Sequence, residues 1–124
     1  MPFLIAGVLL LRLATVEAAD VTGSWALEFQ RDGSNALYQA ECSFKQEGDR
    51  LVGSCLSGFE SLVPVRGNIQ GSHVTFQFTT GVDSGTTAAF SGQLDAQETS
   101  MKGTWRFVDE QGNKGEGTFT ATKR

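Results

Sequence analysis

Apolar and polar residues alternate along most of the chain after Val21. In the segment H-V-T-F-Q-F-T-T, residues 73–80, Val74, Phe76 and Phe78 alternate with polar residues. A period of two places alternate side chains on one face, so this segment is predicted to be a strand with one buried face. The same alternation recurs along the chain and gives about eight predicted strands. The other inward-facing sets are Trp25, Leu27 and Phe29; Tyr38, Ala40, Cys42 and Phe44; Val63, Val65 and Ile69; Phe90 and Leu94; Met101, Trp105 and Phe107; and Phe119 and Ala121.

Short polar stretches separate these runs. Residues 31–35, 47–49, 70–72, 82–85 and 109–113 are rich in Gly, Asp, Asn and Ser, which favour turns. Loops of this length join neighbouring antiparallel strands. The chain is therefore predicted to be all-β, with hairpin connections throughout.

Six segments share an apolar residue, a spacer, a glycine, a small polar residue and another apolar residue. They are V-T-G-S-W, L-V-G-S-C, V-R-G-N-I, F-S-G-Q-L, M-K-G-T-W and G-E-G-T-F, where the last has glycine in the first position. Their glycines, which we interpret as structural, are Gly23, Gly53, Gly67, Gly92, Gly103 and Gly117.

These glycines fall on the inward face of their strands. A glycine there removes a side chain from a crowded interior and lets the strand bend, with neighbouring aromatic residues covering the exposed backbone. Closing a short sheet on itself requires such bends. We therefore predict a single up-and-down antiparallel β-barrel of about eight strands over residues 19–124. A two-sheet sandwich is the competing interpretation, because turn spacing fits both.

The two cysteines predict one register. Cys42 and Cys55 lie on apolar faces of consecutive strands. If they face each other directly, residues 47–50 form a four-residue hairpin loop, which is a permitted length. A disulfide here would hold together a small exported domain.

The N-terminus has the pattern of a secretory signal. Residues 1–13 are almost wholly apolar, and Val16-Glu17-Ala18 provides small residues for a signal peptidase. We predict that residues 1–18 are a signal peptide, which leaves roughly a hundred residues for one domain. The apolar run is too short to span a bilayer, so no membrane span is expected after processing. The predicted location is secreted or periplasmic.

Charge and side-chain chemistry narrow the function classes. The net charge is −4 and the charges are scattered, so no stripe of Lys and Arg indicates nucleic-acid binding. Two cysteines and the lone His73 are too few for a zinc site, and we expect no metal and no cofactor. His73 begins a strand on its polar face, so no Ser-His-Asp set is apparent, and the protein is predicted to be non-catalytic.

Several motifs resemble those of known barrel families. The G-S-W of residues 23–25 resembles the G-x-W signature of lipocalins. In that family a late Arg packs over the Trp, a role that the resemblance gives to Arg124 or Lys123 over Trp25. The successive T-G-S-W, L-V-G-S-C, T-T-A-A-F-S-G-Q, M-K-G-T-W and T-F-T-A-T-K resemble the strand motifs of the avidin family, in the same order. The resemblance implies a calycin-like barrel.

The ligand contacts of the avidin family carry over only in part. Phe90 and Trp105 match the aromatic walls against biotin, and Ser57 matches a hydroxyl contact. Leu27 and Cys55 stand where the family has Asn and Tyr. Each ureido group buried without a partner would cost about 1–3 kcal/mol, so we predict no tight biotin binding.

The inward aromatic residues lead to a functional hypothesis. We expect a binding protein for a small apolar or aromatic molecule, while the sequence leaves the ligand's identity and the oligomeric state open. The predicted ligand contacts are Tyr38, Ser57, Phe76, Phe78, Phe90, Trp105 and Phe119. One alternative is that the rings simply fill the barrel. Others are a protein-binding barrel, such as a protease inhibitor that inserts its N-terminal segment, and a cofactor-free cyclase-type enzyme that acts by confinement.

Overall fold

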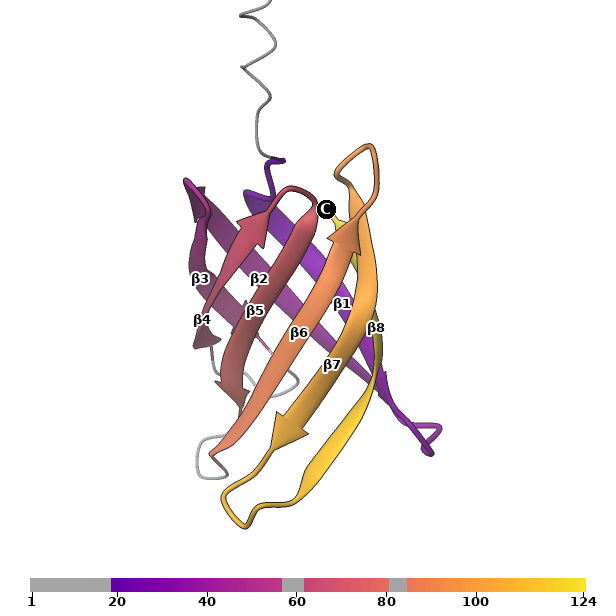
Figure 1. Cartoon of the computed structure of the whole chain (residues 1–124). Helices are drawn as coiled ribbons and strands as arrows, with labels where there is room; N and C mark the ends of the chain where they lie inside the picture. The colour runs from indigo at the N-terminus through magenta and orange to yellow at the C-terminus, as the bar shows by residue number, and fades with distance from the viewer. Residues whose placement is uncertain (1–18, 57–61, 81–84) are drawn as a thin grey trace, which may run out of the picture.

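Eight antiparallel strands close into one up-and-down barrel in the computed structural model of the chain (Figure 1). The structure describes residues 19–56, 62–80 and 85–124, so the predicted signal peptide lies outside it. The strands are β1(Gly23–Arg31), β2(Leu37–Glu47), β3(Arg50–Leu56), β4(Leu62–Gln70), β5(His73–Thr80), β6(Thr86–Leu94), β7(Ser100–Val108) and β8(Lys114–Lys123). β1 pairs with both β2 and β8. The predicted barrel is therefore confirmed, and the sandwich interpretation is excluded.

The inward faces form one apolar core. Trp25, Phe76 and Phe90 are each no more than 2% exposed, and the other strands contribute residues of the same kind. Among the described residues, none of the buried side chains is polar or charged. This clean division follows from the period-two alternation in the sequence, because each strand has only one face that meets the interior.

A disulfide joins Cys42 of β2 to Cys55 of β3, which pair directly across the two strands. The predicted register is therefore confirmed. The connecting loop is shorter than expected, because Glu47 pairs with Arg50 and leaves Gly48 and Asp49 as a two-residue turn. The positive φ of 68° at Gly48 suits such a turn, since glycine adopts it without a steric penalty.

Four of the six glycines of the repeated motif lie where a neighbouring backbone approaches closely. A Cβ added at Gly67 would lie 1.9 Å from the carbonyl oxygen of Thr75, and one added at Gly117 would lie 1.8 Å from that of Gln30. Gly53 and Gly103 have the same relation to their neighbouring strands. These glycines therefore permit close strand packing, and the space beside each is taken by backbone rather than left open for a ligand.

One end of the barrel is sealed by the segment before β1. Val21 is fully buried, its N–H donates to Gln46 Oε1 at 2.9 Å, and its carbonyl accepts the indole N–H of Trp25 at 2.9 Å. The C-terminus lies at the same end (Figure 1), where the N–H of Arg124 donates to the carbonyl of Ser24. We call this the closed end and the opposite end the mouth.

Lys123 and Arg124 make different contacts at the closed end. Lys123 Nζ lies 5.9 Å from the ring centroid of Trp25, within the range of a cation–π contact. Arg124 instead forms an ion pair with Glu41 on the outer face of β2. The position over the tryptophan, which the lipocalin resemblance gave to either residue, is thus occupied by Lys123.

Candidate functional site

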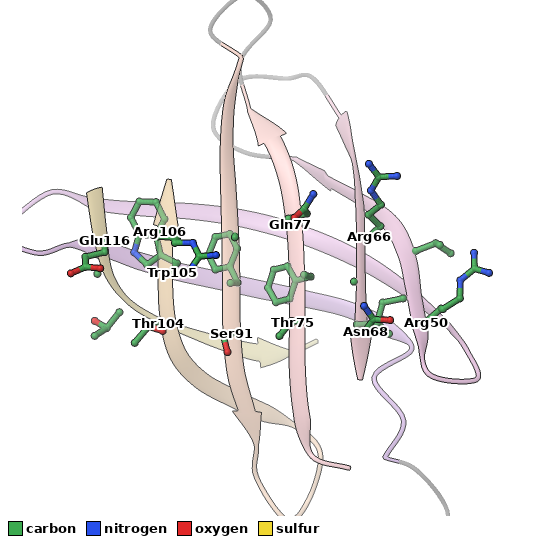
Figure 2. A pocket seen from close by; sticks show the side chains of 18 of the residues that line it. Arg50, Arg66, Asn68, Thr75, Gln77, Ser91, Thr104, Trp105, Arg106 and Glu116 are labelled. Carbon is green, nitrogen blue, oxygen red and sulfur yellow. The ribbon is translucent and has the colours of Figure 1, made fainter. Parts of the chain in front are cut away.

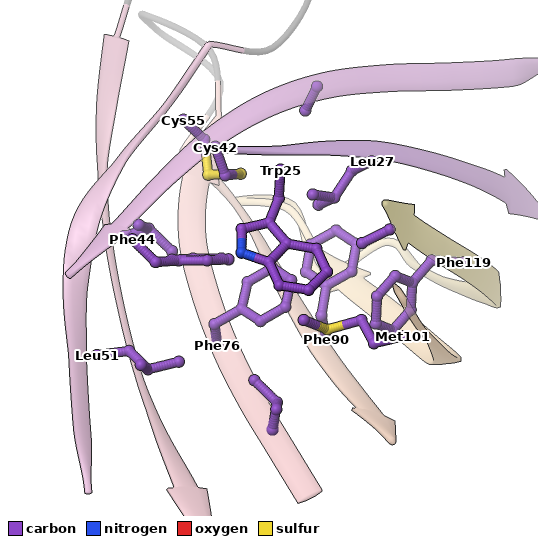
Figure 3. Close-up of a cluster of buried hydrophobic side chains, with 14 of the residues drawn as sticks. Trp25, Leu27, Cys42, Phe44, Leu51, Cys55, Phe76, Phe90, Met101 and Phe119 are labelled. Carbon is purple, nitrogen blue, oxygen red and sulfur yellow. A yellow bond between two sulfur atoms is a disulfide. The ribbon is translucent and has the colours of Figure 1, made fainter. Parts of the chain in front are cut away.

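The centre of the barrel is filled by aromatic side chains. Figure 3 shows Trp25, Phe44, Phe76, Phe90 and Phe119 within one buried cluster. The ring centroids of Phe76 and Phe90 are 4.8 Å apart and stacked, and those of Phe90 and Phe119 are 5.1 Å apart at a steep angle. Such separations are those of aromatic rings in contact. The deep interior is therefore packed with side chains, as one of the sequence-based alternatives expected.

Above this packed centre, four aromatic residues form a second group toward the mouth. We call Phe29, Tyr38, Trp105 and Phe107 the mouth cluster. The ring of Phe29 lies 5.5 Å from that of Tyr38 and 4.9 Å from that of Trp105. Trp105 also stacks on Phe107 at 5.7 Å. The cluster arises because β1, β2 and β7 each carry an inward aromatic residue at this end of the barrel.

Exposure within the mouth cluster differs sharply from ring to ring. Tyr38 is 43% exposed, whereas Trp105 is 6% exposed and Phe29 is 7% exposed. The indole N–H of Trp105 donates to the carbonyl of Gln30 at 3.1 Å, which fixes the orientation of that ring. The guanidinium of Arg31 lies 5.1 Å from the Phe107 ring centroid and places a positive charge at the rim. The mouth thus presents the exposed ring of Tyr38 beside the buried ring of Trp105, whose orientation is fixed.

The residues predicted to contact a ligand lie at different depths. Tyr38 and Trp105 belong to the mouth cluster, and Phe90 lies beneath them with its centroid 5.9 Å from that of Trp105. Phe78 stacks on Phe90, whereas Phe76 and Phe119 lie in the packed centre. Ser57 lies outside the described residues.

Two members of the mouth cluster were absent from the predicted ligand contacts. Phe29 and Phe107 both belong to the inward alternation of their strands, so the signal that identifies them as inward-facing is present in the sequence. Their position at the mouth depends on the barrel's register, which pairs Phe29 with Tyr38 and Phe107 with Gly115.

His73 belongs to a hydrogen-bonded group on the outer surface. Its Nδ1 lies 3.0 Å from Gln93 Oε1, and its Nε2 lies 3.3 Å from Ser91 Oγ. A hydroxyl, an imidazole and an orienting group in this order resemble the arrangement of a nucleophile and its base. However, β5 and β6 are each paired on both sides, so their backbone N–H groups are engaged in the sheet and provide no oxyanion hole. The geometry does not support acyl transfer.

Three aspartates have lowered pKa values, and each lies in a turn or at the chain's described start. The pKa of Asp95 is lowered chiefly by the backbone N–H of Thr99, and that of Asp109 chiefly by the side chain of Asn113. The pKa of Asp20 is lowered chiefly by the backbone N–H of Thr22. These hydrogen bonds shape local backbone, so the shifts indicate turn formation and not acid–base chemistry.

The described ranges contain neither a cluster of metal-ligating side chains nor a membrane-spanning helix. In residues 19–56, 62–80 and 85–124, no group of three or more His, Cys, Asp or Glu residues is placed to hold a metal ion. The same part of the chain contains no helix that is long and apolar enough to cross a membrane.

Comparison with known proteins supports the fold. No protein-family model matches the chain, and no curated protein matches it. The crystal structure of apo shwanavidin, in its P1 form, is similar with a TM-score of 0.61 and 15% sequence identity, over 87% of this chain and 100% of that chain. Likeness at this identity shows the fold alone. The chain thus has an avidin-like barrel fold with an aromatic core.

Proposed function

We propose that the chain is a non-catalytic, exported barrel that binds a small apolar or aromatic molecule at the mouth cluster. The observation that carries this proposal is the exposure of Tyr38 on top of an otherwise buried aromatic stack. A flat ligand that covers Tyr38 and the edge of Trp105 would extend this stack by one layer. Burying apolar area in this way contributes about 25 cal/mol per Å².

The chemistry of the site sets the class of ligand. Leu27 is 1% exposed, and Cys55 is engaged in the disulfide, so neither offers a polar partner to a ligand. The Tyr38 hydroxyl is a donor and acceptor at the rim of the mouth. We therefore propose a ligand with an apolar or aromatic body and at most a small polar end. The same chemistry supports the prediction of no tight biotin binding.

The position of the N-terminal segment bears on the protease-inhibitor alternative. Inhibition through an inserted arm requires residues before β1 that project from the barrel. In the described part of the chain, Val21 is buried beneath Trp25, and Ala19 packs against the core. This arrangement supports a ligand-binding role at the opposite end over an inserting arm.

Tryptophan fluorescence can test the proposal, because the two tryptophans lie at opposite ends of the barrel. In Trp25→Phe the remaining reporter is Trp105 at the mouth, and in Trp105→Phe it is Trp25 at the closed end. We use nitrobenzene as the probe, since it is small, apolar and aromatic and quenches tryptophan on contact. We expect saturable quenching of Trp105 and only weak, non-saturating quenching of Trp25.

Two further comparisons keep this experiment decisive. If Trp25→Phe does not fold, the difference between the wild-type protein and Trp105→Phe isolates the signal of Trp105. Tyr38→Ser should abolish saturation, whereas Leu37→Ser, which removes a 56% exposed leucine from the adjacent outward position, should not. Quenching of Trp105 that rises linearly with nitrobenzene in the wild-type protein would contradict the proposal.

A further inference from the structure

The outer surface of the barrel carries a hollow that shares only Trp105 with the mouth cluster. This hollow of about 1040 Å³ lies over β3 to β8, and Figure 2 shows the side chains that line it. It runs across six neighbouring strands, which spans about 24 Å at about 4.8 Å per strand. The hollow is thus elongated and crosses the strands instead of following one of them.

Strand register arranges the outward side chains of this hollow in two rows. Each row crosses the six strands through directly paired residues, and short hydroxyl side chains make up much of the floor. The first row is Arg50, Asn68, Thr75, Ser91, Thr104 and Thr118. The second row is Val52, Arg66, Gln77, Ala89, Arg106 and Glu116.

The short side chains form a floor, and longer polar side chains stand above it. Thr75, Ala89 and Ser91 are half-buried, whereas Arg66 and Arg106 are exposed on either side of them. In Figure 2 Arg50 and Arg66 lie at one end of the hollow, and Arg106 and Glu116 lie at the other. The hollow therefore offers hydroxyl and amide groups along its length and guanidinium groups at both ends.

Charge is segregated on this face, although the chain as a whole has a net charge of −4. Strands β3 to β7 contain four basic residues and no acidic residue. These basic residues are Arg50, Arg66, Lys102 and Arg106. The ion pairs within the described residues join Lys45 to Glu47 and Arg124 to Glu41, so the four cations of this face enter none of them. Glu116 and Asp32 line only the β8 end.

We propose that this hollow binds an acidic oligosaccharide. Threonine, serine, asparagine and glutamine side chains both donate and accept hydrogen bonds, as sugar hydroxyls do. Guanidinium groups bind carboxylates and similar anions through paired, charge-assisted hydrogen bonds. The two carboxylates at the β8 end are acceptors for further sugar hydroxyls. The elongated shape fits a chain of several sugars better than a single one.

Two other anionic partners fit these observations less well. An acidic peptide would bind by adding a strand or by inserting apolar anchors, but the closed barrel has no free edge. The outward rows contain no aromatic residue and only Val52 and Ala89 as apolar residues. Phe76, Phe90 and Trp105 of the row between them also line the hollow, but they are at most 6% exposed, so they offer no anchor pocket. Single-stranded nucleic acid needs exposed aromatic platforms for its bases, and the aromatic rings that line this hollow are buried.

The test is titration of the ¹⁵N-labelled mature protein with hexagalacturonate, followed by NMR. We expect saturable shifts in the amides of Thr75, Ser91 and Thr104. The fully methyl-esterified hexasaccharide, which keeps the sugars and masks the charges, should bind about tenfold more weakly, the scale of one charge-assisted hydrogen bond. Added NaCl should weaken binding of the acid form, because these charges are exposed to solvent.

Matched variants show where on the barrel hexagalacturonate binds. Arg66→Gln and Arg106→Gln should each weaken hexagalacturonate binding about tenfold. Arg124→Gln removes the same charge at the closed end, outside the lining of the hollow, and should leave binding unchanged, and so should Tyr38→Ser at the mouth. Thermal unfolding of each variant verifies that it is folded.

Several results would overturn the proposal. These are the absence of saturable shifts, equal weakening by Arg124→Gln, and binding of hexaglutamate or hexathymidylate as tight as that of hexagalacturonate. Tight hexaglutamate binding would assign the face to an acidic peptide, and tight hexathymidylate binding would assign it to nucleic acid.

Discussion

Gly67 of β4 pairs directly with Phe76 of β5, so the phenylalanine ring and a bare backbone share the space that two side chains would otherwise fill. The relation recurs around the barrel, where a motif glycine is paired with an aromatic residue in four further places. These pairs are Gly23 and Gly53, each with Phe44, Gly103 with Phe119, and Gly117 with Trp105. Aromatic rings that cover glycine backbone in this way let the sheet curve without exposing it.

Replacing a motif glycine should therefore destabilise the barrel. In Gly67→Ala the added methyl group would lie 1.9 Å from the carbonyl oxygen of Thr75, so one of the two strands must shift. We expect a loss of about 3 kcal/mol in the free energy of unfolding, the upper range for overpacking. Urea denaturation measures it. The control Asn68→Ala changes an exposed neighbour and should cost little, and equal midpoints for the two variants would contradict the close-packing role.

The disulfide should contribute measurably to stability. Cys42 and Cys55 are separated by 13 positions in the sequence. Closing a loop of that length is expected to contribute about 3 kcal/mol, chiefly by restricting the unfolded chain. Urea unfolding of the oxidised protein should therefore occur at a clearly higher midpoint than unfolding of Cys42→Ala/Cys55→Ala. Coincident curves would show that the barrel does not depend on this bond.

Burial of Val21 predicts that the segment before β1 is part of the folded domain. Val21 is 0% exposed and lies against Trp25 at the closed end. Val21→Ala should lower the free energy of unfolding by about 2 kcal/mol, because it removes two buried methyl groups. Thr22→Ser, which removes one exposed methyl group and keeps the hydroxyl that accepts the N–H of Gln46, is the comparison. If the two variants unfold alike, Val21 does not seal the barrel.

Stability should fall in acid partly because of Asp95. Its pKa is lowered below the ordinary value of 3.8, chiefly by the backbone N–H of Thr99. A lowered pKa in the folded state means that the unfolded chain takes up the proton first as the pH falls. The charged carboxylate therefore stabilises the fold at pH values above 3.8. This contribution is lost as the pH falls from 3.8 through the lowered pKa of the folded state.

Asp95→Asn isolates this effect. The variant should be less stable than the wild-type protein at neutral pH, and the difference in melting temperature should narrow in strong acid. Thermal unfolding over a series of pH values measures both. A difference that stays constant over that series would contradict the role of the charged carboxylate.

The sequence predicts the barrel well because its signals are local. The alternation of Val74, Phe76 and Phe78 indicates one strand without reference to the rest of the chain, and the facing cysteines supply the register of β2 and β3. The glycine motif adds the curvature that distinguishes a closed barrel from a sandwich. None of these inferences needs knowledge of side-chain rotamers.

The alternation does not predict whether the interior of the barrel is packed or hollow. Phe90 contacts Phe29, Phe76, Trp105 and Phe119, which come from four other strands. Whether such rings surround a cavity or touch one another depends on how all of them pack together in three dimensions. The alternation shows that they face inward, and it does not show how far they reach. The mouth cluster becomes visible only once the packed centre is known.

The grouping of basic residues on the outer face could not be predicted from the sequence either. Arg66 and Arg106 are far apart in the sequence, where the charges look scattered. Once the register is known, the two arginines lie in one row, separated only by Gln77 and Ala89. A basic face built by strand pairing leaves no contiguous run of Lys and Arg to recognise.

The most direct test of ligand binding at the mouth is native mass spectrometry of the mature protein after incubation with a lipid-rich extract of its own host. We predict a retained small molecule on the wild-type protein and on Leu37→Ser, and its loss from Tyr38→Ser with the disulfide intact. A wild-type protein that carries no added mass, or a molecule that Tyr38→Ser retains equally well, would contradict ligand binding at the mouth cluster.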